Sequence, residues 1–252
     1  MPAALLATAD GAPLIIGHRG AMGYRPENTL PAFAYAADLG ARWVELDVHH
    51  SRDGEVVVIH DARLERTTDG AGFVADHTAA QLRQLDAGSW FAATFAGTRI
   101  PTLAEVLTWA RQRQVGVDIE IKNGPRFYQG IESAVAALVE RHDMLERVLV
   151  TSFDHRAVRR VKAVNGRIAT GLLYAARPMD AVALAREAGA VVLLPSWQYV
   201  VAEDVRAAHD AGLAVVAWTS SDPDVLESLR AAGVDGIVTN HPDVAARQVR
   251  VR

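Results

Sequence analysis

Carboxylates in this sequence occur at a spacing that places them on one side of a strand. Glu45 and Asp47 lie two residues apart in one apolar run, and Glu120 lies two residues before Lys122 at the end of another; residues two apart on a strand point the same way. Because burying unpaired carboxylates is costly, three converging ones need a cation. Oxygen ligands in a chain without cysteine suit a hard divalent ion, Mg²⁺ or Ca²⁺. The alternative is that these groups face solvent or pair with arginine.

Two histidines end other apolar runs. His18 and Arg19 lie in a glycine-flanked turn after the first run, and His60 ends the third. A turn does not need these residue types, and catalytic groups concentrate on loops held by a rigid scaffold. Two histidines with pKa values near neutrality can supply a general base and a general acid. Arg19 can hold an anion with two parallel hydrogen bonds.

Lys122 is one of only two lysines in a chain that otherwise uses arginine. We interpret it as a point charge for a phosphoryl oxygen, with an ion pair to Glu120 or a neighbouring aspartate as the alternative. Trp218 ends a later run and is interpreted as an apolar wall for a substrate. A cation, two histidines, an arginine and a lysine together suit phosphoryl chemistry, because the cations offset the charge that develops in the transition state.

Short apolar runs alternate with helix signals along the chain. Such continuously apolar, β-branched runs are typical of strands buried on both faces of a parallel sheet. The repeat predicts an α/β fold, a (β/α)8 TIM barrel, whose active site would lie where the strands end; a doubly wound open sheet is the alternative. The runs are 14–16, 43–48, 56–59, 117–121, 148–151, 168–173, 191–194, 214–218 and 236–239.

Two irregularities interrupt this pattern. The runs number one more than a barrel needs, so we expect either 191–194 or 168–173 to be irregular or not a strand. The link between Asp47 and Val56 is too short for a crossover helix, which takes about a dozen residues or more. The polar segment 62–100 is predicted to be a small insertion after the third strand, within a single barrel domain spanning 1–252.

Charge and hydropathy exclude several classes of protein. The formal net charge is −4 without a basic tract, which argues against a nucleic-acid partner. No apolar run approaches the ~20 residues of a membrane helix, so no stable membrane insertion is expected. Residues 1–11 lack the basic region and apolar core of a secretory signal. We expect a cytoplasmic protein, monomer or homodimer, with a small-molecule substrate.

The motifs taken together resemble the glycerophosphodiester phosphodiesterase family, whose barrel is similar to that of phospholipase C-like phosphodiesterases. They cover nearly the whole chain in the family's order. They are His18-Arg19-Gly20, Pro26-Glu27-Asn28-Thr29, Glu45-Leu46-Asp47-Val48, Arg52-Asp53-Gly54, His60-Asp61, Arg66-Thr67-Thr68, Pro101-Thr102-Leu103, Glu120-Ile121-Lys122, Ser152-Phe153, Trp218-Thr219 and Asp235-Gly236-Ile237-Val238-Thr239-Asn240-His241-Pro242.

The resemblance implies a TIM barrel that hydrolyses glycerophosphodiesters to an alcohol and glycerol 3-phosphate with a divalent metal. It implies metal ligands, an acid–base pair, phosphate contacts and a surface for the glycerol. The metal ligands would be Glu45, Asp47 and Glu120, and the acid–base pair would be His18 and His60. Arg19 and Lys122 would contact the phosphate, and Trp218 would face the glycerol. Glu27 and Asn28 match the motif and are expected in or just behind the substrate site. The nucleophile is either the neighbouring glycerol hydroxyl or a water, and either histidine could be the base.

Two rival functions remain open from the sequence. One is a related phosphodiesterase, phospholipase C- or D-like, that acts on lipid head groups. It would need an exposed apolar or basic surface near the rim, for which Trp90, Phe91 and Phe95 are the candidates. The other is a binding domain without catalysis, which the presence of every expected site residue argues against. Ser220-Ser221 depart from the family pattern after Trp218-Thr219, which bears on one rim contact.

Overall fold

The computed structural model describes residues 11–250. The prediction that the N-terminus is not a secretory signal concerns residues that lie outside this range, apart from Gly11. Within it, no helix combines the length and apolar character needed to cross a bilayer.

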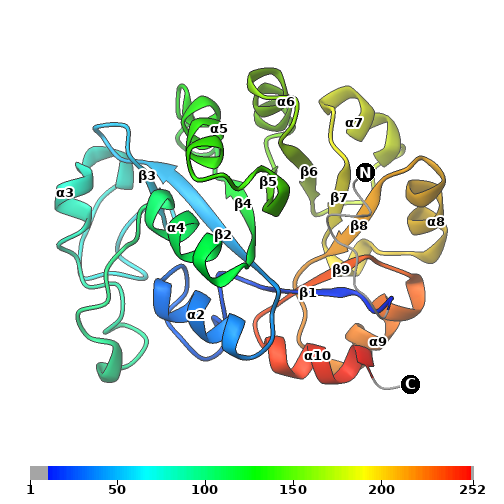
Figure 1. The fold of residues 1–252 in the computed structure, drawn as a ribbon, viewed down its shortest axis with the longest axis horizontal. Helices are drawn as coiled ribbons and strands as arrows, with labels where there is room; N and C mark the ends of the chain where they lie inside the picture. Colours follow the sequence, from blue (N-terminus) through cyan, green and yellow to red (C-terminus); the bar gives the residue numbers. More distant parts are fainter. Residues whose placement is uncertain (1–10, 251–252) are drawn as a thin grey trace.

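Eight parallel strands close into a barrel, seen in Figure 1. Neighbours follow the order β1-β9-β8-β7-β6-β5-β4-β2, and pairing of β1 with β2 closes the ring. This closure confirms the (β/α)8 barrel and excludes the open sheet. The strands are β1 (Leu14–Gly17), β2 (Trp43–His50), β4 (Gly116–Ile121), β5 (Val148–Ser152), β6 (Ala169–Tyr174), β7 (Val192–Pro195), β8 (Ala214–Ala217) and β9 (Gly236–Thr239).

Helices surround the barrel and bury its outer face (Figure 1). Their ends follow local chemistry: Thr29 caps α2, Thr102 and Glu105 form the predicted capping box of α4, and α9 ends at Gly233 with φ 84°. The helices are α2 (Leu30–Asp38), α4 (Leu103–Arg113), α5 (Ile131–Arg141), α6 (His155–Val164), α7 (Ala181–Ala188), α8 (Ala202–Asp210), α9 (Pro223–Ala232) and α10 (Pro242–Arg250). Short 3₁₀ turns, η3 (Leu145–Arg147) and η4 (Trp197–Tyr199), precede β5 and α8.

The extra strand is β3 (Val56–Val58), which lies outside the barrel. It pairs antiparallel with the end of β2, at Val48↔Val58 through His50↔Val56. The expectation that 168–173 or 191–194 would be irregular is therefore wrong, since both contain regular barrel strands, β6 and β7. A strand buried by a hairpin partner and a helix is as continuously apolar as a barrel strand, so hydropathy alone could not separate them.

The segment from 62 to 100 lies beside the barrel next to β3 (Figure 1) and packs on its own small core. Leu64, Val74 and Leu82 are buried there against Val57 and Ile59. Its elements are η1 (Val74–Asp76), α3 (Ala79–Leu82) and η2 (Ala93–Phe95). The segment therefore docks onto β3, at the edge of the barrel where the strands end.

Candidate active site

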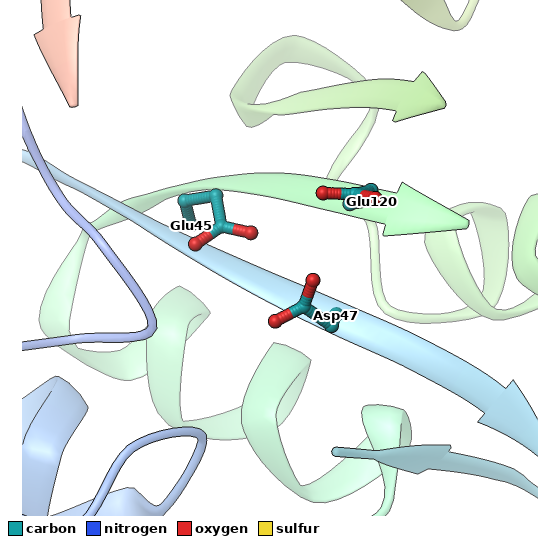
Figure 2. Close-up of side chains that lie close together, drawn as sticks. All are labelled: Glu45, Asp47 and Glu120. Carbon is teal, nitrogen blue, oxygen red and sulfur yellow. The ribbon is translucent and has the colours of Figure 1, made fainter. Parts of the chain in front are cut away.

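Three carboxylates meet where β2 and β4 run side by side, as Figure 2 shows. The strand register pairs Asp47 with Glu120, and Glu45 lies two residues before Asp47 on the same side of β2. One oxygen from each lies within 4.8 Å of the others, and all three side chains are buried. We call Glu45, Asp47 and Glu120 the acidic triad. The spacing in the sequence predicted this convergence.

The triad has the chemistry of a site for a hard cation. Asp47 Oδ1 is buried without a hydrogen-bond partner; Lys122 Nζ lies 3.5 Å away but makes no hydrogen bond to it. Burial and the charge of Asp47 raise the pKa of Glu45 well above its usual range and that of Glu120 to about 7. Burial acts the same way on Asp47, but Lys122 and Arg19 outweigh it and lower its pKa. Three buried oxygen donors with incomplete charge compensation could hold a divalent ion.

Two cations flank the triad. Arg19 Nε lies 3.3 Å from Asp47 Oδ2, and its backbone N–H donates to Glu45 Oε2 at 2.8 Å. Lys122 Nζ lies 2.7 Å from Glu120 Oε1, which is the ion pair that the sequence offered as an alternative. Arg19 adopts φ 48°, and its Nε is buried without a hydrogen-bond partner. An unsatisfied guanidinium donor beside an acidic cluster suits a bound anion.

The two predicted catalytic histidines form hydrogen bonds to different side chains. His18 Nδ1 lies 2.7 Å from the amide oxygen of Asn240, and His60 Nδ1 lies 2.6 Å from a carboxylate oxygen of Asp61. Each contact places the proton on Nδ1 and directs Nε2 toward the acidic triad: His18 Nε2 lies 3.9 Å from Glu45 Oε2, and His60 Nε2 accepts from Lys122 Nζ at 3.2 Å. Burial, with Arg19, lowers the pKa of His18 to about 4, and burial lowers the pKa of His60 as well.

Glu27 and Asn28 lie behind these groups. Glu27 Oε1 accepts from Arg19 at 2.8 Å, and Asn28 Nδ2 donates to Asp47 Oδ2 at 2.8 Å. Both residues are buried, and Asn28 adopts φ 58°, which asparagine tolerates better than most residues. Their polar atoms are thus used to hold Arg19 and Asp47 in place.

Trp218 forms one side of the rim at the end of β8. Its Nε1 donates to the backbone oxygen of Leu194 at 2.7 Å, and its ring meets Phe153 edge to face at 5.4 Å. Ser221, one of the residues that depart from the family pattern, binds Thr239 and His241 at 2.9 and 3.0 Å. Trp218 therefore presents a braced apolar surface.

Sequence reasoning gave no role to three residues that the structure ties to the site. Asn240 and Asp61 orient the two histidines. Asp118 is buried inside the barrel, opposite Glu45 in the strand register, and accepts from Thr151 Oγ1 at 2.8 Å. The sequence could have indicated Asp118, because it precedes Glu120 by two residues and must lie on the same side of the strand.

Stability of the metal-free protein is expected to fall between pH 6.5 and 8. Burial raises the pKa of Asp118 to about 8 and that of Glu120 to about 7, from ordinary values of 3.8 and 4.5. In this window the folded protein keeps protons that the unfolded chain has released, so the free energy of unfolding decreases as pH rises. The effect is about 2 kcal/mol. His18 does not oppose it, because its lowered pKa acts only below pH 6.5.

Urea unfolding of chelator-treated protein at pH 6.5 and at pH 8 measures the difference in the free energy of unfolding. Asp118→Asn keeps the acceptor for Thr151 and should flatten the slope, whereas Asp38→Asn, on the exposed surface of α2, should leave it unchanged. Stability that stays constant or rises over this range would contradict the assignment.

The sequence matches the glycerophosphoryl diester phosphodiesterase family over residues 18–244. The chain is 39% identical to a glycerophosphodiester phosphodiesterase of Caldanaerobacter subterraneus subsp. tengcongensis over 94% of this chain and 98% of that protein. It is 33% identical to the glycerophosphodiester phosphodiesterase of Bacillus subtilis over 92% and 84% of the two chains. The crystal structure of an Oleispira antarctica phosphodiesterase in complex with the product sn-glycerol-3-phosphate superposes with a TM-score of 0.88, at 31% identity, over 96% and 98% of the two chains.

Proposed function

The chain belongs to the glycerophosphoryl diester phosphodiesterase family and hydrolyses glycerophosphodiesters to an alcohol and glycerol 3-phosphate, and we propose that His18 and His60 are its acid–base pair beside a divalent cation on the acidic triad. The observation that carries the proposal is the meeting of three buried carboxylates, two cations and two histidines, with His18 Nε2 3.9 Å from Glu45 and His60 Nε2 3.2 Å from Lys122. Mg²⁺ and Ca²⁺ both suit an all-oxygen ligand set.

The substrate phosphate is held by cations of the chain. Arg19 and Lys122 both lie against the acidic triad, so a phosphate placed there meets the unpaired Nε–H of Arg19 and the positive charge of Lys122. A divalent ion on the triad would offset the negative charge that develops on the phosphoryl oxygens. Trp218 gives the glycerol carbons an apolar surface.

The partners of the histidines support different roles for them. Asn240 is neutral and keeps His18 as a neutral imidazole with Nε2 free, which suits a base that takes the proton from the attacking hydroxyl of glycerol or water. Burial lowers the pKa of His60, but Asp61 is a carboxylate whose hydrogen bond to Nδ1 acts in the opposite direction and favours the protonated ring. His60 is therefore the acid that protonates the departing alcohol.

A second candidate function, action on amphiphilic phosphodiesters, is favoured by one observation. Four adjacent barrel strands are each followed by a loop with at least one exposed large apolar side chain. These side chains, the apolar arc, are Phe127 after β4, Phe153 after β5, Met179 after β6 and Tyr199 after β7. Of the aromatic residues singled out in the sequence, Trp90 is exposed but packs against Phe91 in the segment from 62 to 100, apart from these four loops. Phe91 and Phe95 are half-buried and stack on each other.

Glycerophosphocholine and lysophosphatidylcholine, which share a head group, test the two functions. We expect release of glycerol 3-phosphate from the first, independent of added phosphatidylcholine vesicles. Faster cleavage of the second, co-sedimentation with vesicles and loss of both with Phe127→Ser or Met179→Ser would support the amphiphilic substrate. Val164→Ser, at the far end of α6, is the matched control. Cytoplasmic location and a monomeric or homodimeric state stay predictions of the sequence.

A further inference from the structure

We propose that Arg66, in the segment that follows β3, is a positioning residue. It fixes the positions of Arg19 and His60 relative to each other through two shared carboxylates. The inference rests on the proposed roles of His60 and Arg19. Arg66 touches neither of them directly: its guanidinium lies between Glu27 and Asp61, and each of these carboxylates contacts one of the two site residues.

The first connection runs through Glu27. Arg66 Nη1 donates to Glu27 Oε2 at 2.8 Å, and Nη2 donates to Oε1 at 2.7 Å. Oε1 also accepts from Arg19 Nη1 at 2.8 Å. The Glu27 side chain is only 2% exposed, so its charge depends on both arginines, and the direction in which Arg19 points depends on where Arg66 holds Glu27.

The second connection runs through Asp61. Arg66 Nε donates to Asp61 Oδ2 at 2.6 Å, and Nη2 reaches Oδ1 at 3.0 Å. Oδ1 is the atom that contacts His60 Nδ1 at 2.6 Å. Arg66 therefore decides the position of the carboxylate that orients the imidazole, and so the direction of His60 Nε2.

Only a planar guanidinium satisfies both connections at once. Its five N–H donors lie in one fork, whereas a lysine ammonium is a point charge that cannot engage two carboxylates side by side. The backbone at this point is anchored as well. Leu64 is fully buried, and its carbonyl oxygen accepts from both the N–H and the hydroxyl of Thr68, which closes a turn around Arg66.

Arg66→Ala is expected to lower kcat by about 10- to 100-fold and to raise KM for glycerophosphocholine by about 10-fold, since small displacements of catalytic groups are this costly. Arg66→Lys should recover only part of either loss. Arg63→Ala is the matched control, because Arg63 belongs to the same segment but pairs with the exposed Glu65. It should behave as the unaltered enzyme does. Circular dichroism and thermal melting verify that each variant folds.

Double-mutant cycles separate positioning from mere stabilisation. If Arg66 acts through Asp61, its replacement in an Asp61→Asn background should change kcat by less than about 3-fold. If it acts on Arg19 through Glu27, its replacement in a Glu27→Gln background should change KM equally little. The same cycles with Arg66→Lys decide the question where Arg66→Ala does not fold.

Full additivity in both cycles, or normal kinetics of Arg66→Ala, would overturn the inference. The proposed function is tested separately by His60→Ala in the same assay. An inactive His60→Ala beside a normal Arg66→Ala refutes only the role of Arg66. A fully active His60→Ala refutes the acid–base assignment itself.

Discussion

Replacing His18 or His60 with alanine is expected to lower turnover of glycerophosphocholine by about 10²–10⁴-fold, the range that general acid–base catalysis contributes. Both side chains bond through Nδ1, to Asn240 or Asp61, and present Nε2 to the site, where His60 Nε2 accepts from Lys122 Nζ. Neither ring belongs to the apolar core, so the fold should remain intact. Steady-state kinetics with circular dichroism of each variant makes the measurement. His142→Ala is the matched control, because His142 follows the C-terminal end of α5, away from the site.

The two histidine variants should respond differently to the leaving group. A p-nitrophenyl ester of glycerol phosphate releases an alcohol that needs no protonation. If His60 is the acid, His60→Ala should recover most of its loss on this substrate, whereas His18→Ala should stay inactive. The reverse pattern would exchange the two roles. Turnover near that of the unaltered enzyme in either variant would contradict the acid–base pair.

Removing divalent ions should abolish turnover, and returning Mg²⁺ or Ca²⁺ should restore it. The expected loss is about 10³-fold or more, because Lewis-acid stabilisation of phosphoryl oxygens contributes several kcal/mol. Asp47 carries the clearest negative charge of the triad, since Lys122 and Arg19 outweigh its burial and lower its pKa. Asp47→Asn should therefore lose both activity and the response to added metal.

Activity is measured after exhaustive chelation, followed by titration with each ion. Asp38→Asn, which loses only an exposed ion pair with Arg113, should titrate like the unaltered enzyme. Calorimetry gives a readout that does not depend on catalysis, since the chelated protein should bind the ion and Asp47→Asn should not. Full turnover after complete stripping would rule out a metal site on the triad.

The residues that meet at the rim could be predicted because successive side chains of a strand point to alternate sides. Glu45 with Asp47, and Glu120 with Lys122, share a side of their strands whatever the rest of the fold does. A parallel barrel then brings the ends of its strands to one rim. The capping box of Thr102 and Glu105 was equally local and equally visible. Contacts between residues close in sequence need no knowledge of the tertiary structure.

The place of β3 was not predictable in this way. Its apolar run matches a barrel strand in composition, and only its partners, β2 on one side and the segment from 62 to 100 on the other, reveal that it lies outside the ring. Hydropathy reports that a strand is buried but not which surfaces bury it.

The sequence by itself determined the strand–helix repeat and placed Glu45, Asp47 and Glu120 on matching sides of their strands, because side-chain periodicity is a local property. Closure of the sheet into a barrel was decided by the pairing of β1 with β2. Only the tertiary structure decided how those side chains are held. Asn240 meets His18 across 222 residues of chain, and Arg66 reaches Glu27 across 39. Such contacts depend on strand register and on the docking of a whole segment, which no local pattern encodes.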